Sequence, residues 1–341
     1  MQVVGDLCHD LLTGNIKAKL SFEANKDYNE WKTALRKKWS ELLGIERIKR
    51  NAIPLRFEIE EEKVKDGYKQ IRFTFEWERG AVVPCYLLIP DTGKEKYPVA
   101  ITLQGHSSGF HNSIAEPKTE KEKEYALGRG AFAVQAVKNG FAALAIEQRA
   151  MGERRALIGN RWCREMCSYE ALTAIQLGRT VIGERVLDVH YAIDVLANFK
   201  QLDLDNLIIT GNSGGGTISF YAACFDERIK LSVPSCSFCS YKDSIMTIGH
   251  CACNYIPNAS EWFEMQDLAA LIAPRRLVVI TGQKDEIFPI EGVRNAFETV
   301  EKIYKKAGVE GNTRLVETPR EHWWCEDIVW GTIREEYQKM L

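Results

Sequence analysis

The stretch Leu207-Ile208-Ile209-Thr210-Gly211-Asn212-Ser213-Gly214-Gly215-Gly216 decides the fold of this 341-residue chain. Its first four residues predict a buried strand, and Thr217 to Ala223 has a helical pattern. Gly-x-Ser-x-Gly between strand and helix is typical of a nucleophile elbow, a sharp turn that presents a serine at a helix N-terminus. A phosphate or dinucleotide loop is the rival interpretation, but the run lacks the Lys-Ser/Thr and G-x-G-x-x-G patterns, since position 213 is serine.

Short apolar runs alternate with helical stretches on both sides of this turn. The expected strands are Val99 to Leu103, Phe141 to Ile146, Leu207 to Thr210, Leu231 to Pro234, Leu277 to Thr281 and a weaker Thr313 to Glu317. The expected helices are Ala131 to Lys138, Thr173 to Phe199, Gly216 to Ala223 and Gly292 to Lys306. Such alternation predicts a doubly wound α/β domain with a mostly parallel sheet.

The chain before residue 99 has a different pattern. Alternating residues at Leu55 to Glu62, Lys69 to Trp77 and Val82 to Ile89, separated by turn signals, predict antiparallel strands at the N-terminal edge of the sheet. Asp27 to Leu43 has apolar residues at helical spacing and a glycine just past its end. We therefore expect an N-terminal helical arm over residues 1–50 and an α/β catalytic domain over residues 51–341.

The composition is that of a soluble globular protein, with 45% hydrophobic residues, 27% charged residues and a formal net charge of -2. Interspersed charges do not suggest a nucleic-acid or anionic-membrane surface, so a small-molecule substrate with little charge is expected. The N-terminus lacks the pattern of a signal peptide, and no stretch is apolar enough to span a bilayer. A cytoplasmic location is the resulting expectation.

Ten cysteines in such a chain are expected to be reduced thiols packed as small hydrophobes. A metal site is the alternative, because three pairs stand close in sequence and His250 adjoins the last of them. The pairs are Cys163/Cys167, Cys236/Cys239 and Cys251/Cys253. Only the second pair has the Cys-x-x-Cys spacing that zinc sites usually repeat, so core packing is preferred and no metal or organic cofactor is expected.

A serine hydroxyl needs a base, normally a histidine oriented by a carboxylate. Of the six histidines, His322 fits the chain order serine, acid, histidine of the α/β-hydrolase fold, which we predict for this chain. Asp285, in the loop after the strand Leu277 to Thr281, is the expected acid. Glu286 is the nearest alternative acid. The other alternative is that Asp285 is an ordinary turn aspartate without a catalytic role. The predicted catalytic residues are Ser213, Asp285 and His322.

An acyl-transfer site also needs donors for the oxyanion of the tetrahedral intermediate. The main-chain N–H of Gly214 is one expected donor. The second is expected from the glycine-containing loop that follows Val99 to Leu103, at the N–H of His106.

Other segments flank this predicted site. Asn112 to Tyr125 and Arg149 to Cys167 follow parallel strands at their carboxyl ends, so each is interpreted either as a solvated loop or as a lid or pocket wall. Among the aromatic residues, Trp323, Trp324 and Tyr255 are candidates for substrate binding, with core packing as the equal alternative.

These residues resemble a known family, the bacterial α/β-hydrolases grouped under the name of acetyl xylan esterases and related to dienelactone hydrolases. The resemblance runs from the helix around Trp31 to His322. Its landmarks are Val83 to Pro90, Gln104-Gly105-His106, Arg149 to Arg154, the elbow at Ser213, Asn254 to Pro257, and Leu268 to Pro289. Gln104 replaces a histidine frequent in the family, which bears on substrate specificity, and Ser213 replaces the cysteine nucleophile of dienelactone hydrolase itself.

The resemblance implies a serine esterase for acetyl or other short-acyl esters that acts without a cofactor, and it makes a homo-oligomer the expected assembly. Because a cytoplasmic enzyme does not meet polymeric xylan, an imported acetylated oligosaccharide is the expected substrate. A prolyl-oligopeptidase-type peptidase is the first alternative, although 50 residues of arm cannot supply its accessory domain. A catalytically silent binding module of the same fold is the second.

Overall fold

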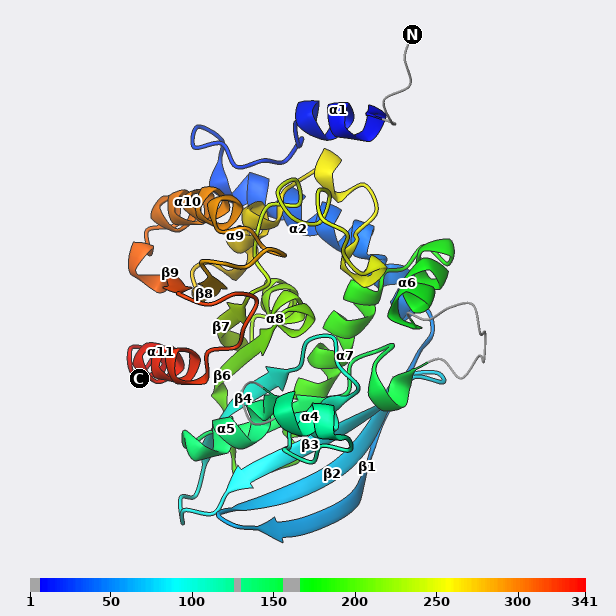
Figure 1. The fold of residues 1–341 in the computed structure, drawn as a ribbon, viewed down its shortest axis with the longest axis vertical. Coiled ribbons are helices and arrows are strands. Elements are labelled where there is room, and N and C mark those ends of the chain that lie inside the picture. The colour runs from blue at the N-terminus through cyan, green and yellow to red at the C-terminus, as the bar shows by residue number, and fades with distance from the viewer. Residues whose placement is uncertain (1–6, 126–129, 156–165) are drawn as a thin grey trace.

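The computed structural model describes residues 7–125, 130–155 and 166–341 (Figure 1). At its centre nine strands form one sheet in the order β1-β2-β3-β5-β4-β6-β7-β8-β9. The pairs β1·β2, β2·β3 and β3·β5 are antiparallel, and the remaining pairs are parallel. The strands are β1 Ala52–Lys65, β2 Tyr68–Glu78, β3 Val82–Pro90, β4 Tyr97–Leu103, β5 Ala142–Ile146, β6 Leu202–Asn212, β7 Ile229–Ser235, β8 Arg276–Gly282 and β9 Thr313–Thr318. The predicted sheet, with its antiparallel N-terminal edge, is confirmed.

Helices cover both faces of this sheet because its central strands are apolar on both sides. In β8, Leu277 and Val279 belong to one hydrophobic core, and Val278 and Ile280 belong to the other. Figure 1 shows α10 and α11 on opposite sides of β8 and β9. The described α-helices are α1 Cys8–Asn15, α2 Tyr28–Leu43, α3 Ile45–Lys49, α4 Glu120–Tyr125, α5 Phe132–Lys138, α6 Met166–Gln176, α7 Val181–Leu196, α8 Gly214–Phe225, α9 Ala269–Ile272, α10 Ile290–Lys306 and α11 Glu326–Gln338.

Helix α2 of the N-terminal segment packs into the larger of the two cores. Its buried stripe is Trp31, Leu35, Trp39 and Leu43, as the helical spacing predicts. Asp27 caps the N-terminus by accepting a hydrogen bond from the N–H of Glu30 (2.9 Å). The arm is thus anchored by apolar burial as well as by its chain connection.

The single helix predicted from Thr173 to Phe199 is instead two helices, α6 and α7. Gly178, between them, has φ 67°, a left-handed conformation that ends α6. The Thr180 hydroxyl then caps α7 by accepting from the N–H of Gly183 (3.0 Å). An apolar pattern that continued across the break concealed these two local signals.

Candidate active site

Ser213 stands at the turn between β6 and α8 with φ 55° and ψ −126°. A non-glycine residue in this conformation is strained by about 1–3 kcal/mol, so the surrounding structure must enforce it. The carbonyl oxygen of Leu103 lies only 2.4 Å from where a Cβ on Gly211 would stand, and 2.0 Å from one on Gly215. Only glycine fits at either position, and the N–H of Ser213 is held by the carbonyl of Ser235 (2.9 Å).

His322 and Asp285 form a close pair at the same edge of the sheet. His322 Nδ1 lies 2.8 Å from Asp285 Oδ2. The other carboxylate oxygen accepts from the main-chain N–H groups of Ile287 (2.8 Å) and Phe288 (3.1 Å). Because the buried carboxylate is fixed in this way, it favours the imidazole tautomer that carries its proton on Nδ1 and leaves Nε2 as an acceptor.

The two loops that carry this pair are locked together. The N–H of Gln283 donates to the carbonyl of Thr318 (2.8 Å), and that of Lys284 donates to Arg320 (3.0 Å). A Cβ on Gly282 would lie 2.2 Å from the carbonyl oxygen of Glu321. Since β6, β8 and β9 are parallel, their carboxyl ends bring the serine, the acid and the histidine to one edge.

Cys236, after β7, is a neighbour of this pair that the sequence did not single out as functional. Its sulfur lies within 4.8 Å of a carboxylate oxygen of Asp285 and of a ring nitrogen of His322. Burial raises the pKa of this thiol to about 12, and the charge of Asp285 adds to the shift. A thiol that stays protonated near pH 7 is a poor nucleophile.

The loop after β4 lies directly against the turn. A Cβ on Gly105 would stand 3.1 Å from the Cβ of Ser213, so glycine permits this approach. The imidazole of His106 lies over Gly214, where an added Cβ would be 3.1 Å from ring atoms Cε1 and Nδ1 and 3.9 Å from the main-chain nitrogen of His106. The two main-chain groups expected as oxyanion donors are therefore neighbours.

A buried carboxyl beneath this loop was missed by the sequence analysis. Glu147, directly after β5, accepts from Gln104 Nε2 (3.0 Å) and from the N–H groups of Phe110 (3.2 Å) and Glu153 (3.3 Å). Burial raises its pKa to about 7. Gln104, the residue of this loop that departs from the family pattern, thus joins the loop to Glu147 by a hydrogen bond. The signal available in the sequence was an acidic residue adjoining a fully apolar strand.

A cavity of about 660 Å³ opens beside the His106 loop, and eight of its nine lining residues have polar or charged side chains. Its lining residues are His106, Ser107, Ser108, Asn112, Thr119, Lys121, Glu122, Glu124 and Trp323. Glu122 ties this wall together because it accepts from the N–H groups of Lys118 (2.6 Å) and Thr119 (3.0 Å) and contacts His111 (3.1 Å). The described part of the charged segment Asn112 to Tyr125 therefore contributes a wall of the cavity.

The three aromatic candidates are placed differently. Trp323 lines the cavity. Trp324 is 0% exposed, packs edge-on against Phe132 and donates to Gln135 Oε1 (2.9 Å), so its prediction as a substrate-binding residue is wrong. Its indole is held by the core beneath α5, away from solvent. Tyr255 is half-exposed, lies outside the cavity lining and donates to the carbonyl of Ile245 (2.8 Å).

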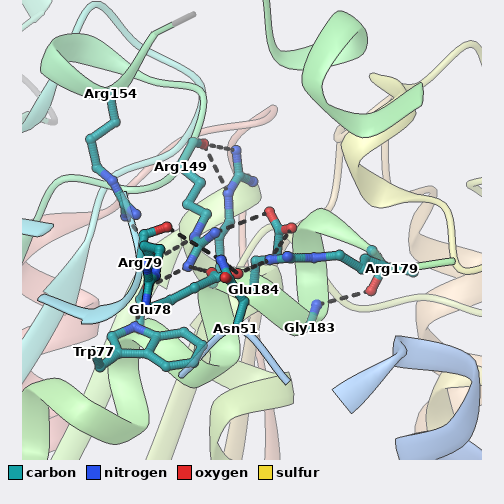
Figure 2. A network of polar contacts seen from close by, with 12 residues as sticks. Asn51, Trp77, Glu78, Arg79, Arg149, Arg154, Arg179, Gly183 and Glu184 are labelled. Atoms are coloured by element: carbon teal, nitrogen blue, oxygen red, sulfur yellow. Dashed lines mark hydrogen bonds and ion pairs between the residues drawn. The ribbon is translucent and has the colours of Figure 1, made fainter. Parts of the chain in front are cut away.

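The segment Arg149 to Cys167 begins in a network of buried and partly buried charges (Figure 2). Three guanidinium groups meet three carboxylates with separations of 2.6–3.5 Å. The cations are Arg149, Arg154 and Arg179, and the anions are Glu78, Glu184 and Asp188. The network ties the loop after β5 to β2 and α7. Residues 156–165 of this segment, Cys163 included, lie outside the described residues.

No helix in the described ranges is both long enough and apolar enough to cross a membrane.

This chain is similar to a family of hydrolases and to several solved esterase structures. Residues 6–338 match the model of the Abhydrolase family. The "Putative hydrolase YtaP" of Bacillus subtilis (strain 168) is 25% identical over 242 residues, 70% of this chain and 77% of the relative. Among solved structures, a "putative acetyl xylan esterase" from Bacteroides fragilis has a TM-score of 0.74 at 17% identity, covering 93% of this chain and 83% of that one. A glucuronoyl esterase from Solibacter usitatus has a TM-score of 0.67 at 15% identity, covering 95% and 98%.

The fold and the arrangement at its sheet edge define an α/β-hydrolase. The chain belongs to the Abhydrolase family, which its match over nearly the whole length establishes. The expected resemblance to α/β-hydrolases of the acetyl xylan esterase type is confirmed, and so is the prediction of a hydrolytic enzyme.

Proposed function

We propose that this protein is a serine carboxylesterase that hydrolyses acetyl and other short-acyl esters. The observation that carries the proposal is Ser213, a serine held at φ 55° between glycines that nothing larger can replace. Its support is the Asp285–His322 pair delivered to the same sheet edge. The names of the similar solved structures, acetyl xylan and glucuronoyl esterases, agree with ester cleavage.

The reaction assigned to these residues proceeds through an acyl-enzyme. Ser213 Oγ attacks the ester carbonyl while His322 Nε2 takes the hydroxyl proton, and Asp285 stabilises the resulting imidazolium. The main-chain N–H groups of His106 and Gly214 bind the oxyanion of the tetrahedral intermediate. Collapse breaks the bond to the alcohol, which leaves with the proton from His322. Water, deprotonated by the same imidazole, then releases the carboxylic acid and regenerates the serine.

The cavity wall offers hydrogen-bond partners for a hydroxyl-rich alcohol portion of the substrate. Eight of its nine lining residues are polar or charged, and Trp323 is the aromatic one. Sugar hydroxyls hydrogen-bond to such groups, and sugar rings stack on indole faces. We therefore assign an acetylated oligosaccharide as the substrate class. We also propose the cytoplasm as the place where the enzyme meets it, as expected from the N-terminal sequence.

The decisive experiment measures hydrolysis of p-nitrophenyl acetate, butyrate and octanoate, with acetate release from acetylated xylo-oligosaccharides in parallel. The expected result is turnover that falls with acyl length and is lost in Ser213→Ala. Ser219→Ala is the matched control, because this serine lies in α8, the helix that follows Ser213, and donates to the carbonyl of Gly215 (2.8 Å). A folded wild type that turns over no ester would refute the proposal in favour of the peptidase or the binding module. A fluorophosphonate adduct on Ser213 separates these two alternatives.

A further inference from the structure

Four possible metal ligands meet where the Nε2 side of the His106 ring points away from Gly214. His106, Cys167, Cys251 and Cys253 each offer one ligand atom, and these four atoms all lie within 4.8 Å of one another. His106 Nε2 is 3.1 Å from Cys253 Sγ and 3.8 Å from Cys167 Sγ. The donors come from three separate parts of the chain: the loop after β4, the first turn of α6, and the 3₁₀ turn η4 (Ala252–Asn254) with the residue before it.

We propose that these four residues bind one Zn²⁺ ion in a structural site beside the active site. Three thiolates and an imidazole are a recognised tetrahedral donor set for zinc. With bond lengths of about 2.3 Å to sulfur and about 2.0 Å to nitrogen, tetrahedral geometry separates the donor atoms by about 3.5–3.8 Å. The two separations from His106 Nε2 to sulfur, 3.1 and 3.8 Å, bracket this range, and no pair of the four ligand atoms is more than 4.8 Å apart, so the ion requires only small side-chain movements.

A buried arginine without a carboxylate partner supports a negative charge at this place. Arg185 is 2% exposed, and its guanidinium contacts Cys167 Sγ (3.2 Å), Cys253 Sγ (3.6 Å) and the carbonyl of Arg149. Among the described residues, Arg185 forms no ion pair with a carboxylate. The three carboxylates of the neighbouring network pair instead with Arg149, Arg154 and Arg179 (Figure 2). Zn²⁺ with three thiolates and a neutral imidazole carries one negative charge, which Arg185 neutralises.

The side chains packed around the cluster bury too little apolar area to hold the three segments together by themselves. The described buried residues of this small core are alanines, cysteines and one valine, namely Ala150, Cys167, Ala171, Ala174, Val181 and Cys253. Such short side chains bury little apolar area compared with the leucine- and phenylalanine-rich cores on the sheet. A metal ion that joins three segments supplies the missing cross-link, as in other small metal-stabilised regions. Zinc thus replaces core packing as our account of these three cysteines.

The site would fix the loop that carries an expected oxyanion donor. The His106 ring presents Nε2 to the cysteines and its Nδ1 and Cε1 face to Gly214, so one imidazole connects the metal to the elbow. All four ligands come from the protein, which leaves no position for water or substrate and defines a structural rather than a catalytic ion. This consequence for catalysis rests on the proposed function, whereas zinc binding does not.

The first test measures metal in the whole protein, purified under reducing conditions from zinc-supplemented cells. Elemental analysis should find about one zinc ion per chain. After chelation and replacement by Co²⁺, the spectrum should contain the visible bands of tetrahedral cobalt and a thiolate charge-transfer band. A reduced protein that retains less than about 0.1 zinc per chain after incubation with Zn²⁺ and dialysis overturns the proposal. Thiol titration that finds a disulfide between these cysteines in protein purified without reductant, with no metal, also overturns it.

The second test uses substitutions that remove single ligands. Cys251→Ala and Cys253→Ala should lower zinc content at least about tenfold, whereas Cys85→Ala should leave it unchanged. Cys85 is the matched control because it is a buried cysteine of β3, outside the cluster. If a ligand variant does not fold, the cobalt spectrum of the wild type still decides the question. Zinc retained equally by both ligand variants and the control overturns the assignment.

A third measurement separates this inference from the proposed function. Removal of zinc should slow fluorophosphonate labelling of Ser213 by about tenfold or more, because the His106 loop loses its anchor. Labelling at an unchanged rate after complete removal would refute the effect on the loop. Zinc content and the cobalt spectrum do not depend on ester turnover, so a zinc-containing protein without esterase activity would refute only the proposed function.

Discussion

Replacing Glu147 by glutamine should change how the stability of this protein depends on pH. Burial raises the pKa of the Glu147 carboxyl from 4.5 to about 7. The folded protein therefore retains this proton over a range in which the unfolded chain has lost it. The resulting stability is fully present below pH 4.5 and is lost as the pH rises through about 7. A shift of this size corresponds to about 3 kcal/mol of unfolding free energy.

The assay is chemical denaturation of wild type and Glu147→Gln at intervals from pH 4.5 to pH 8. Because glutamine is neutral throughout, the variant should gain about 3 kcal/mol relative to wild type between these limits. Two other buried carboxyls with raised pKa values, Glu264 and Asp267, are present in both proteins and cancel in the difference. A flat or falling difference for Glu147→Gln would refute the reasoning, because the N–H donors would then hold the carboxylate ionised.

The elbow glycine, the strained serine and the two adjacent tryptophans give three further tests. Gly215→Ala should lower the free energy of unfolding by at least about 3 kcal/mol, because its Cβ would lie 2.0 Å from a main-chain oxygen of β4. Gly249→Ala is the control and should change stability little, because no atom lies within 4 Å of its added Cβ. Ser213→Gly should abolish ester hydrolysis yet raise the free energy of unfolding by about 1 kcal/mol, because glycine adopts a positive φ without strain. A loss of stability in this variant would contradict the inference that Ser213 is strained. Trp324→Ala should lower the free energy of unfolding by about 3–5 kcal/mol because the indole is fully buried. Trp323→Ala should mainly raise KM, because this side chain lines the cavity. Equal effects of the two changes on stability would contradict the assignment of Trp324 to the core and Trp323 to the cavity.

Local sequence patterns fixed the order and type of most elements because strand and helix periodicities are properties of neighbouring residues. The strand before Ser213 and the helix after it were predictable since an apolar run, a glycine-rich turn and a second apolar pattern follow one another directly. The C-terminal helix α11, Glu326–Gln338, escaped prediction. Its hydrophobic residues are separated by several charged ones and gave a weaker pattern than the central strands. The break between α6 and α7 was missed because apolar residues continue across it.

Within the site, the sequence by itself determined Ser213, Asp285 and His322 as candidates, because the position of a residue at a strand end and its order along the chain are both readable. Only the tertiary structure decided which side chains meet. It paired His322 with Asp285, placed Trp323 in the cavity and its neighbour Trp324 in the core, and gathered His106 with three cysteines up to 147 residues away. The physical reason is that side-chain contacts between distant segments depend on how strands are ordered and loops cross, and no local spacing encodes that geometry.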